Sequence, residues 1–157
     1  MPLLTRLALT AAAVFSAAAF TAGCDNVQPS AFTQAQAEQR VTTRAQEALK
    51  QLPPGATLKV DFSEPEQPCD GGPNGRTFVE TNYSIAYPEG WPVEQTVRTL
   101  ADYWTKQGYK TIRDDRTDDK LPDFSAEDPD GFRIGARLTY RDTGRIDAYL
   151  ISSSPCL

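Results

Sequence analysis

Hydrophobic residues recur every three or four positions in two parts of the chain, and both parts carry helix start and stop signals. The first part begins after Thr33, whose spacing from Gln36 is that of a capping box, and ends at Pro53-Pro54-Gly55. The second part begins at Pro92 and ends at Gly108. Proline is favourable at the start of a helix, because the N–H of a residue in the first helical turn has no partner within the helix. The apolar stripes consist of Ala37, Val41, Ala45, Ala48, Leu49 and Leu52 in the first part and of Val93, Val97, Leu100, Ala101 and Trp104 in the second. The spacing predicts two helices, each with one buried face.

Elsewhere hydrophobic residues alternate with polar ones, which is the pattern of a half-buried β-strand. The alternating segments are 58–62, 79–87, 109–113, 121–127, 132–140 and 146–150. In the first of them the alternating residues are Leu58, Val60 and Phe62. Turn sequences at 128–131 and 142–144 separate the last three segments, so these should form an antiparallel meander. The chain is therefore expected to fold as an α+β two-layer sandwich of order αββαβββ, with two helices on one face of a curled, mainly antiparallel sheet.

The N-terminal part of the chain has a different pattern. Arg6 is its only charged side chain, and an unbroken run of apolar and small residues extends from Leu7 to Phe20. This is typical of a secretory signal peptide, and it is shorter than the roughly 20 apolar residues of a permanent membrane span. The run ends in Thr21-Ala22-Gly23-Cys24, which resembles the bacterial lipobox, in which the cysteine receives diacylglycerol before cleavage. The alternative is a secreted protein with an incidental cysteine.

These patterns divide the chain into three parts. Residues 1–23 are expected to be a lipoprotein signal peptide, residues 24–30 a tether lipidated at Cys24, and residues 31–157 a single α+β domain. Removal of Arg6 with the signal leaves 15 of the 16 basic side chains against 21 acidic ones, a formal charge of −6. No basic run is present, so nucleic acid is not expected as a partner.

The three cysteines agree with export. With Cys24 lipidated, Cys69 and Cys156 remain, and an even pair in an exported chain predicts a disulfide. It would close a loop of nearly ninety residues, which contributes on the order of 4 kcal/mol in the chain-entropy model. Metal ligation is the alternative, but the chain has no histidine to complete a site.

Candidate catalytic chemistry is sparse. Without histidine there is no Ser-His-Asp or Cys-His arrangement, and no serine has lysine three residues later. Carboxylate chemistry of the glycosidase type stays open, because acidic residues are abundant. Two groups of acidic residues lack the EF-hand spacing and are expected to be solvated turns. The first group consists of Asp114, Asp115, Asp118 and Asp119, and the second of Glu127, Asp128 and Asp130. We therefore expect no catalytic residue, no metal and no cofactor.

One predicted strand offers a candidate binding face. If Phe132, Ile134, Ala136, Leu138 and Tyr140 point toward the helices, then Arg133, Arg137 and Arg141 point the other way, and Tyr149 shares their face from the next strand. Such a row of guanidiniums suits an anionic or sugar-bearing ligand. The alternative is an ordinary solvent face, in which the arginines pair with nearby acids.

Several short motifs carry a resemblance. They are Pro68-Cys69, Trp104 with Gly108-Tyr109, Asp130-Gly131-Phe132 and Ser153-Ser154-Pro155-Cys156. Together they resemble the small envelope lipoproteins of actinobacteria and are similar to the mycobacterial LppA-like group, and an alanine-rich chain with 11 Arg against 5 Lys suits such a source. The resemblance covers most of the chain after residue 23 and carries over no catalytic residue.

The function expected from the sequence is that of a non-enzymatic binding or scaffolding module of the cell envelope. The protein would be anchored in the cell membrane by its N-terminal lipid, on the extracytoplasmic side, and its other partner would be an anionic or glycan envelope ligand or a protein. The alternative is a carboxylate-dependent enzyme that acts on cell-wall glycan.

Overall fold

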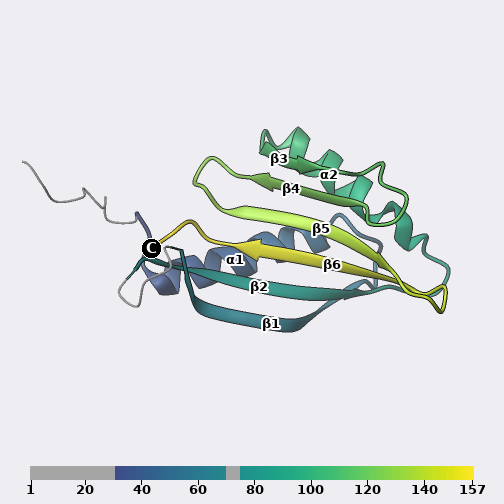
Figure 1. Cartoon of the computed structure of the whole chain (residues 1–157), viewed down its shortest axis with the longest axis horizontal. Helices are drawn as coiled ribbons and strands as arrows, with labels where there is room; N and C mark the ends of the chain where they lie inside the picture. The colour runs from purple at the N-terminus through teal and green to yellow at the C-terminus, as the bar shows by residue number, and fades with distance from the viewer. Residues whose placement is uncertain (1–30, 70–74) are drawn as a thin grey trace, which may run out of the picture.

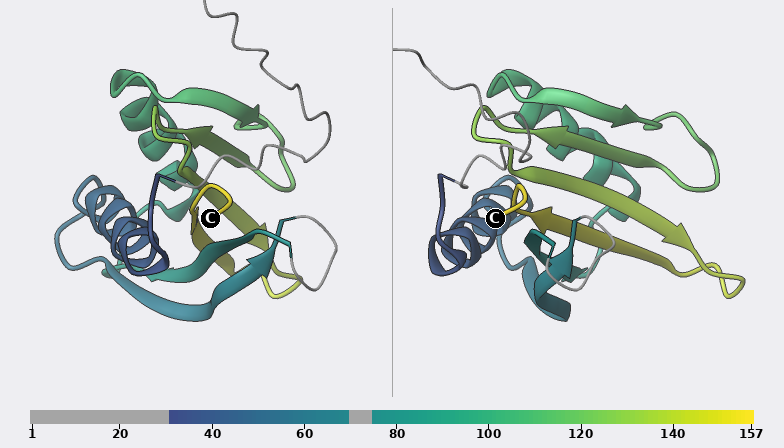
Figure 2. Two further views of the ribbon diagram at one scale, coloured as in Figure 1. Left: turned by 90° about the vertical axis from the view of Figure 1, so that its left-hand side faces the viewer. Right: turned by 60° about the vertical axis from the view of Figure 1, so that its left-hand side comes forward.

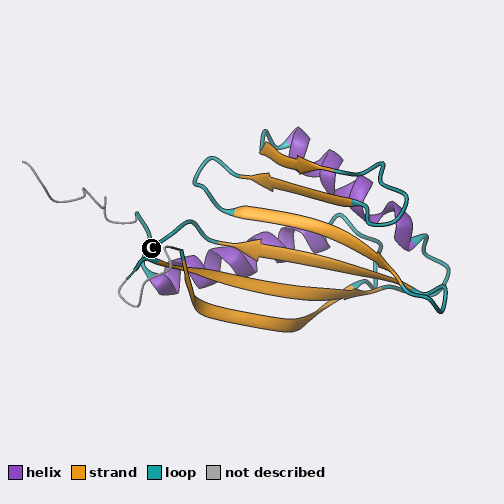
Figure 3. Ribbon diagram, in the orientation of Figure 1, coloured by secondary structure: helices purple, strands orange, loops and turns teal. Residues whose placement is uncertain are grey.

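A computed structural model describes residues 31–69 and 75–157. Within these residues the helices are α1 (Gln34–Leu49) and α2 (Thr96–Lys106), and a 3-10 turn, η1 (Val93–Gln95), precedes α2. The strands are β1 (Thr57–Pro68), β2 (Thr77–Ala86), β3 (Lys110–Asp114), β4 (Asp123–Glu127), β5 (Arg133–Tyr140) and β6 (Ile146–Ser153). Figure 3 shows the helices and strands in separate colours.

All strand pairs are antiparallel, and they form one open sheet in the order β1-β2-β6-β5-β4-β3 (Figure 1). Both helices lie on the same side of this curved sheet (Figure 2), so the predicted α+β sandwich is confirmed. The expected order αββαβββ is wrong by one strand. Four strands follow α2 in the described part of the chain, one for each of the four alternating segments after Gly108, whereas the expected order counts only three.

Local signals in the sequence explain both helices. The capping box of α1 is present: the Thr33 hydroxyl accepts from the Gln36 N–H at 3.3 Å, and the Gln36 side chain accepts from the Thr33 N–H at 2.9 Å. At the end of α2, Gly108 has φ 79°, and the N–H of Tyr109 donates to the carbonyl of Trp104 at 3.1 Å. This is the hydrogen bond of a Schellman motif, and it turns the chain directly into β3.

The core lies between the helices and the sheet. Alanines at positions 37, 45 and 48 let α1 approach β2 and β6 closely, whereas α2 packs on β4 and β5 through larger side chains. Trp104 is 1% exposed, and its ring stacks on that of Phe124 with the centroids 6.1 Å apart. Both clusters of buried hydrophobic residues lie between residues 37 and 150, so residues 31–157 contain a complete core and should fold on their own.

The edge strand β1 departs from simple alternation. Val60 lies opposite Tyr83, but after a bulge Phe62 lies opposite Asn82, so one extra residue separates them in register. Tyr83 and Asn82 are neighbours in β2 and point to opposite faces of the sheet, so their partners Val60 and Phe62 also point to opposite faces. Alternation of Leu58, Val60 and Phe62 would have placed all three on one face, which is wrong for Phe62.

Candidate functional site

The candidate site lies on the open face of the sheet, which we define as the face away from the helices and which Figure 1 views directly. The predicted alternation holds for Phe132 and for Ile134, Ala136 and Leu138 of β5, which are buried, whereas Arg133 and Arg137 are exposed. Tyr140, which was expected on the buried face, is 41% exposed at the end of β5. In the sheet register, Arg137 lies between Asp123 of β4 and Tyr149 of β6. The predicted arginine face therefore exists, with Arg133, Arg137 and Tyr149 on it.

Arg141 belongs to the same face but is engaged with its neighbours. It lies one residue beyond β5, and its Nε donates to Asp147 Oδ2 at 2.6 Å while Nη2 donates to the Tyr149 hydroxyl at 2.8 Å. Arg145 also pairs with Asp147, at 2.9 Å. The hydrogen bond from Arg141 is the main reason why the pKa of Asp147 lies below its usual value. This cluster closes one end of the arginine face.

The two remaining arginines of the face differ in their partners. Arg133 donates through Nε to Glu127 at 3.1 Å, although its side chain is 64% exposed. Arg137 is exposed, and within the described residues it has no hydrogen bond or ion pair. The alternative of arginines paired with nearby acids therefore describes Arg133 and Arg141 but not Arg137.

Gly135 lies between these two arginines along β5 and leaves a hollow of about 320 Å³ in the open face. A Cβ at Gly135 would come within 3.0 Å of the Phe124 carbonyl oxygen and 3.2 Å of the Ser125 Cβ, so a side chain here would crowd β4. The hollow is lined by Arg113, Arg133 and Arg137 on strands β3 and β5 and by Phe78 and Ile151 on strands β2 and β6. We call these five residues and Gly135 the arginine hollow.

A second hollow, of about 520 Å³, adjoins the arginine hollow and shares Phe78, Arg133 and Ser153 with it. It extends to the bonded pair Cys69 and Cys156, whose sulfur atoms are 2.10 Å apart. The predicted disulfide is thus present in the structure. It joins the residue after β1 to the C-terminal tail after β6. We call the two hollows together the open-face groove.

Sequence reasoning missed four members of the arginine hollow. Phe78 and Ile151 each adjoin a hydrophobic residue, in Phe78-Val79 and in Leu150-Ile151, and a break of this kind in alternation signals apolar residues on both faces. No comparable signal exists for Arg113 or Gly135. Their positions depend on the register of β3, β4 and β5, which a bulge in β3 shifts.

The two carboxylates that line the arginine hollow are far apart. Glu80 of β2 and Asp123 of β4 both line the arginine hollow. Three strand spacings separate β2 from β4, which is about 14 Å between backbones. Glycosidase carboxylates lie about 5–10 Å apart.

The acidic turn between β4 and β5 corrects one expectation. Asp128 is not solvated: its side chain is fully buried and pairs with Arg44 at 2.6 Å. It also accepts from the N–H groups of Asp130 and Phe132, at 2.9 and 3.0 Å. Burial lowers the pKa of Arg44, but hydrogen bonds to Glu47 and Asp128 outweigh it, so the net shift is upward.

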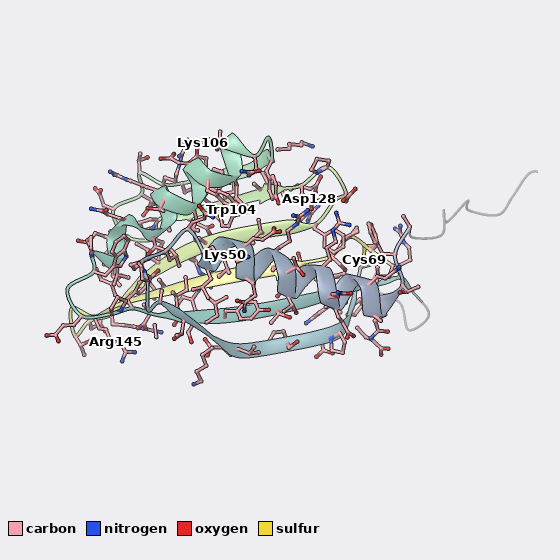
Figure 4. All side chains as sticks on the ribbon, turned by 180° about the vertical axis from the view of Figure 1, so that it is seen from behind. Lys50, Cys69, Trp104, Lys106, Asp128 and Arg145 are labelled. Atoms are coloured by element: carbon pink, nitrogen blue, oxygen red, sulfur yellow. A yellow bond between two sulfur atoms is a disulfide. The ribbon has the colours of Figure 1, made fainter. Side chains whose placement is uncertain are left out.

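A further hollow, of about 430 Å³, lies along the exposed side of α1. Its cations are Arg40 and Arg44, and both are paired, with Asp130 and Asp128 respectively. These pairs attach α1 to the β4–β5 turn, and Figure 4 shows Asp128 at that turn. The arginines of this hollow therefore hold two elements of the fold together, which distinguishes them from Arg137.

Other predictions concern features outside the open face. The signal peptide 1–23, the tether and Cys24 lie outside the described residues. Among residues 31–69 and 75–157, no group of three or more His, Cys, Asp or Glu side chains is placed to hold a metal ion. No helix in this part of the chain is long and apolar enough to cross a membrane.

No protein-family model, no curated protein and no solved structure matches the chain. The resemblance to actinobacterial envelope lipoproteins therefore stays a prediction.

Proposed function

We propose that this protein is a lipid-anchored module of the cell envelope that binds an anionic ligand through its open-face groove and has no enzymatic activity. The observation that carries the proposal is Arg137, an exposed guanidinium without a partner among the described residues, at the edge of a hollow that two further arginines line.

The geometry of β5 supports binding of one compact anion. Arg133 and Arg137 each lie two residues from Gly135, about 7 Å away along the strand, so their side chains can reach over the glycine from opposite directions. A guanidinium presents its N–H groups in a planar fork that matches carboxylate and phosphate oxygens. The volume of the hollow, about 320 Å³, falls within the range of small-ligand sites.

The separation of the carboxylates favours binding over glycan hydrolysis. Hydrolysis needs two acidic groups on either side of one glycosidic bond, whereas Glu80 and Asp123 lie on strands about 14 Å apart. Arg133 and Arg137, on β5, lie between the strands of these two acids and suit attraction of an anion.

The anchor determines where the ligand would be found. With lipid on Cys24, the seven residues 24–30 can separate the membrane from the domain by at most about 25 Å, even when fully extended. The groove would then sample anionic groups close to the outer surface of the cell membrane.

Ligand binding is tested with phosphocellulose, a glycan that carries phosphate groups, and with unmodified cellulose as a control for the resin. We expect residues 25–157 to be retained on phosphocellulose at low salt and the variant Arg133→Gln/Arg137→Gln to elute much earlier. The matched control is Arg98→Gln/Lys106→Gln, which removes the same charge from α2 on the other side of the sheet, where Figure 4 shows Lys106.

The charge of the protein makes this test stringent. A net charge of −6 opposes retention on a polyanion, so retention requires local clustering of cations. Added salt should release the parent protein, because exposed charges are screened within about 10 Å at 0.1 M ionic strength. Equal elution of the parent and the Arg133→Gln/Arg137→Gln variant would refute binding by this face.

Anchoring is tested on the full chain by metabolic labelling with an alkyne-tagged fatty acid. We expect label on the parent chain and none on Cys24→Ala, because acylation needs the thiol. Two or three acyl chains contribute about 0.8 kcal/mol per buried methylene, which is enough for stable anchoring. A parent chain without label, or a labelled Cys24→Ala chain, would refute lipidation at this residue.

A further inference from the structure

We infer that the ligand of the open-face groove is an amphiphile, with a phosphate monoester head in the arginine hollow and an apolar chain that extends past Phe78 to the disulfide. This inference rests on the proposed function and deepens it, because it assigns a chemical class to the ligand of the same groove.

The head-group site follows from which nitrogen atoms the ion pairs leave unused. Arg133 and Arg113 contact their nearest acids through Nε, at 3.1 Å to Glu127 and 2.5 Å to Asp115. The closest additional acid is 3.9 Å from Arg113 Nη1. Among the described residues, no hydrogen bond or ion pair is made by the Nη groups of Arg133, by Nη2 of Arg113 or by any nitrogen of the Arg137 guanidinium, so these groups can contact a ligand.

Strand register places the three arginines around Gly135. Ser125 of β4 lies opposite Gly135 on one side and Arg113 of β3 on the other. Arg113 is therefore level with Gly135, two strand spacings or about 10 Å away, and the other two arginines lie above and below the glycine on β5. Three guanidiniums that line one hollow suit a group with three terminal oxygens, which is a phosphate monoester.

The apolar part of the groove lies opposite the arginines. Phe78 and Ile151 form the wall on strands β2 and β6. Beyond Phe78, the second hollow has Pro68, Pro155 and the disulfide in its lining, together with Gly131, two serines, Arg76 and Glu127. A bare phosphate ion would leave Phe78 and Ile151 exposed to water, whereas an attached alkyl chain would cover them.

The direction of the groove fits a lipid. Phe32, just before α1, packs edge-on against Phe132 with ring centroids 5.1 Å apart, and the N–H of Leu157 donates to the carbonyl of Thr77 at 2.7 Å. The start of the described chain, the C-terminus and the disulfide are thus at one end of the domain (Figure 1). An apolar chain in the second hollow would point toward the end to which the proposed anchor connects.

The inference is tested by calorimetric titration of residues 25–157 with three probes. These are dodecyl phosphate below its micelle concentration, inorganic phosphate and dodecyl maltoside, which has the same chain without charge. We expect dodecyl phosphate to bind at least tenfold more tightly than inorganic phosphate, and dodecyl maltoside at least tenfold more weakly than dodecyl phosphate. Arg137→Gln should weaken binding of both phosphates.

Two phenylalanines of the open face provide a matched pair of variants. Phe78→Ser should abolish the advantage of dodecyl phosphate over inorganic phosphate but keep phosphate binding. Phe62→Ser, whose phenylalanine is 42% exposed on the same face but lines neither hollow, should behave as the parent. If Phe78→Ser fails to fold in a thermal melt, Ile151→Ser replaces it with the same expectation.

The outcomes separate this inference from the proposed function. Equal affinity for inorganic phosphate and dodecyl phosphate would refute the amphiphile and leave anion binding intact. Binding of dodecyl maltoside as tight as that of dodecyl phosphate would also refute it, because the arginines would then contribute nothing. Failure of all three probes together with loss of retention on phosphocellulose would refute both proposals.

Discussion

The two faces of the sheet are built from alternate residues of the same strands, yet they differ in how completely their side chains are satisfied. On the helix-covered face, Ile134, Ala136 and Leu138 are at most 2% exposed. On the open face, Arg137 has no partner among the described residues, and Gly135 leaves a hollow beside it. Burial in the core explains the residues of the covered face, whereas folding does not explain Arg137 and Gly135 on the open face. This contrast makes the open face the better candidate for function.

The largest expected effect is on the covered face. Trp104→Ala removes a ring that is 1% exposed and stacked on Phe124, so it should lower the free energy of unfolding by about 3–5 kcal/mol. On the open face, Ile151→Ala removes a half-buried side chain and should cost about 1 kcal/mol. Urea denaturation of residues 25–157 measures both. Equal losses would mean that the open face is as much part of the core as the covered one.

The disulfide lies outside the sheet, where it joins the residue after the edge strand β1 to the tail after β6 and lines one end of the open-face groove. Replacing Cys69 and Cys156 by serine should lower the free energy of unfolding by about 2–4 kcal/mol and the melting temperature by about 10 °C. A thiol assay on denatured, unreduced protein (residues 25–157) should find no reactive thiol. Two reactive thiols would contradict the bridge.

Tyr87 reports on the end of the core where β2 meets α2. Burial raises its pKa to about 12, despite the hydrogen bond of 2.6 Å between its hydroxyl and that of Thr96. In the unfolded chain tyrosine loses its proton near pH 10, so this contribution to stability is complete below pH 10 and is lost as the pH rises toward 12. Urea denaturation across this range should show the decline, and Tyr87→Phe should reduce it. A pH dependence that is identical in Tyr87→Phe would show that another group causes the decline.

The smallest effect is expected for the open-face arginines. Arg133→Gln/Arg137→Gln should change the free energy of unfolding by about 0.5 kcal/mol or less, because exposed ion pairs such as Arg133–Glu127 contribute little. Urea denaturation of the variant and the parent checks this. A loss above about 2 kcal/mol would place these arginines among the residues that hold the fold.

Prediction from the sequence succeeded where a hydrophobic period and the residues that start and end the helix or strand lie close together in the chain. Both helices, the capping box at Thr33 and the alternation of β5 are local features of this kind. Prediction failed where the burial of a residue, or the face on which it lies, depends on a partner far away in the sequence. Asp128 is buried because Arg44, 84 residues away, pairs with it, and Phe62 changes face because of a bulge in the pairing of β1 with β2.

The candidate site shows the same division. Alternation alone predicted Arg133, Arg137 and Tyr149, since successive side chains of a strand point to opposite faces of the sheet. Arg113 and Gly135 join them only through the register of three strands, which local sequence does not determine.

The most direct test of binding by the open face is a titration of ¹⁵N-labelled residues 25–157 with inorganic phosphate, followed by amide chemical shifts, with sodium chloride at equal ionic strength as the control. We expect the largest shifts at Gly135 and its cross-strand neighbours Ser125 and Ile151, and no shift of the amides of α1. Shifts centred on Arg40 and Arg44 of α1, or none beyond those that chloride causes, would contradict binding by the open face.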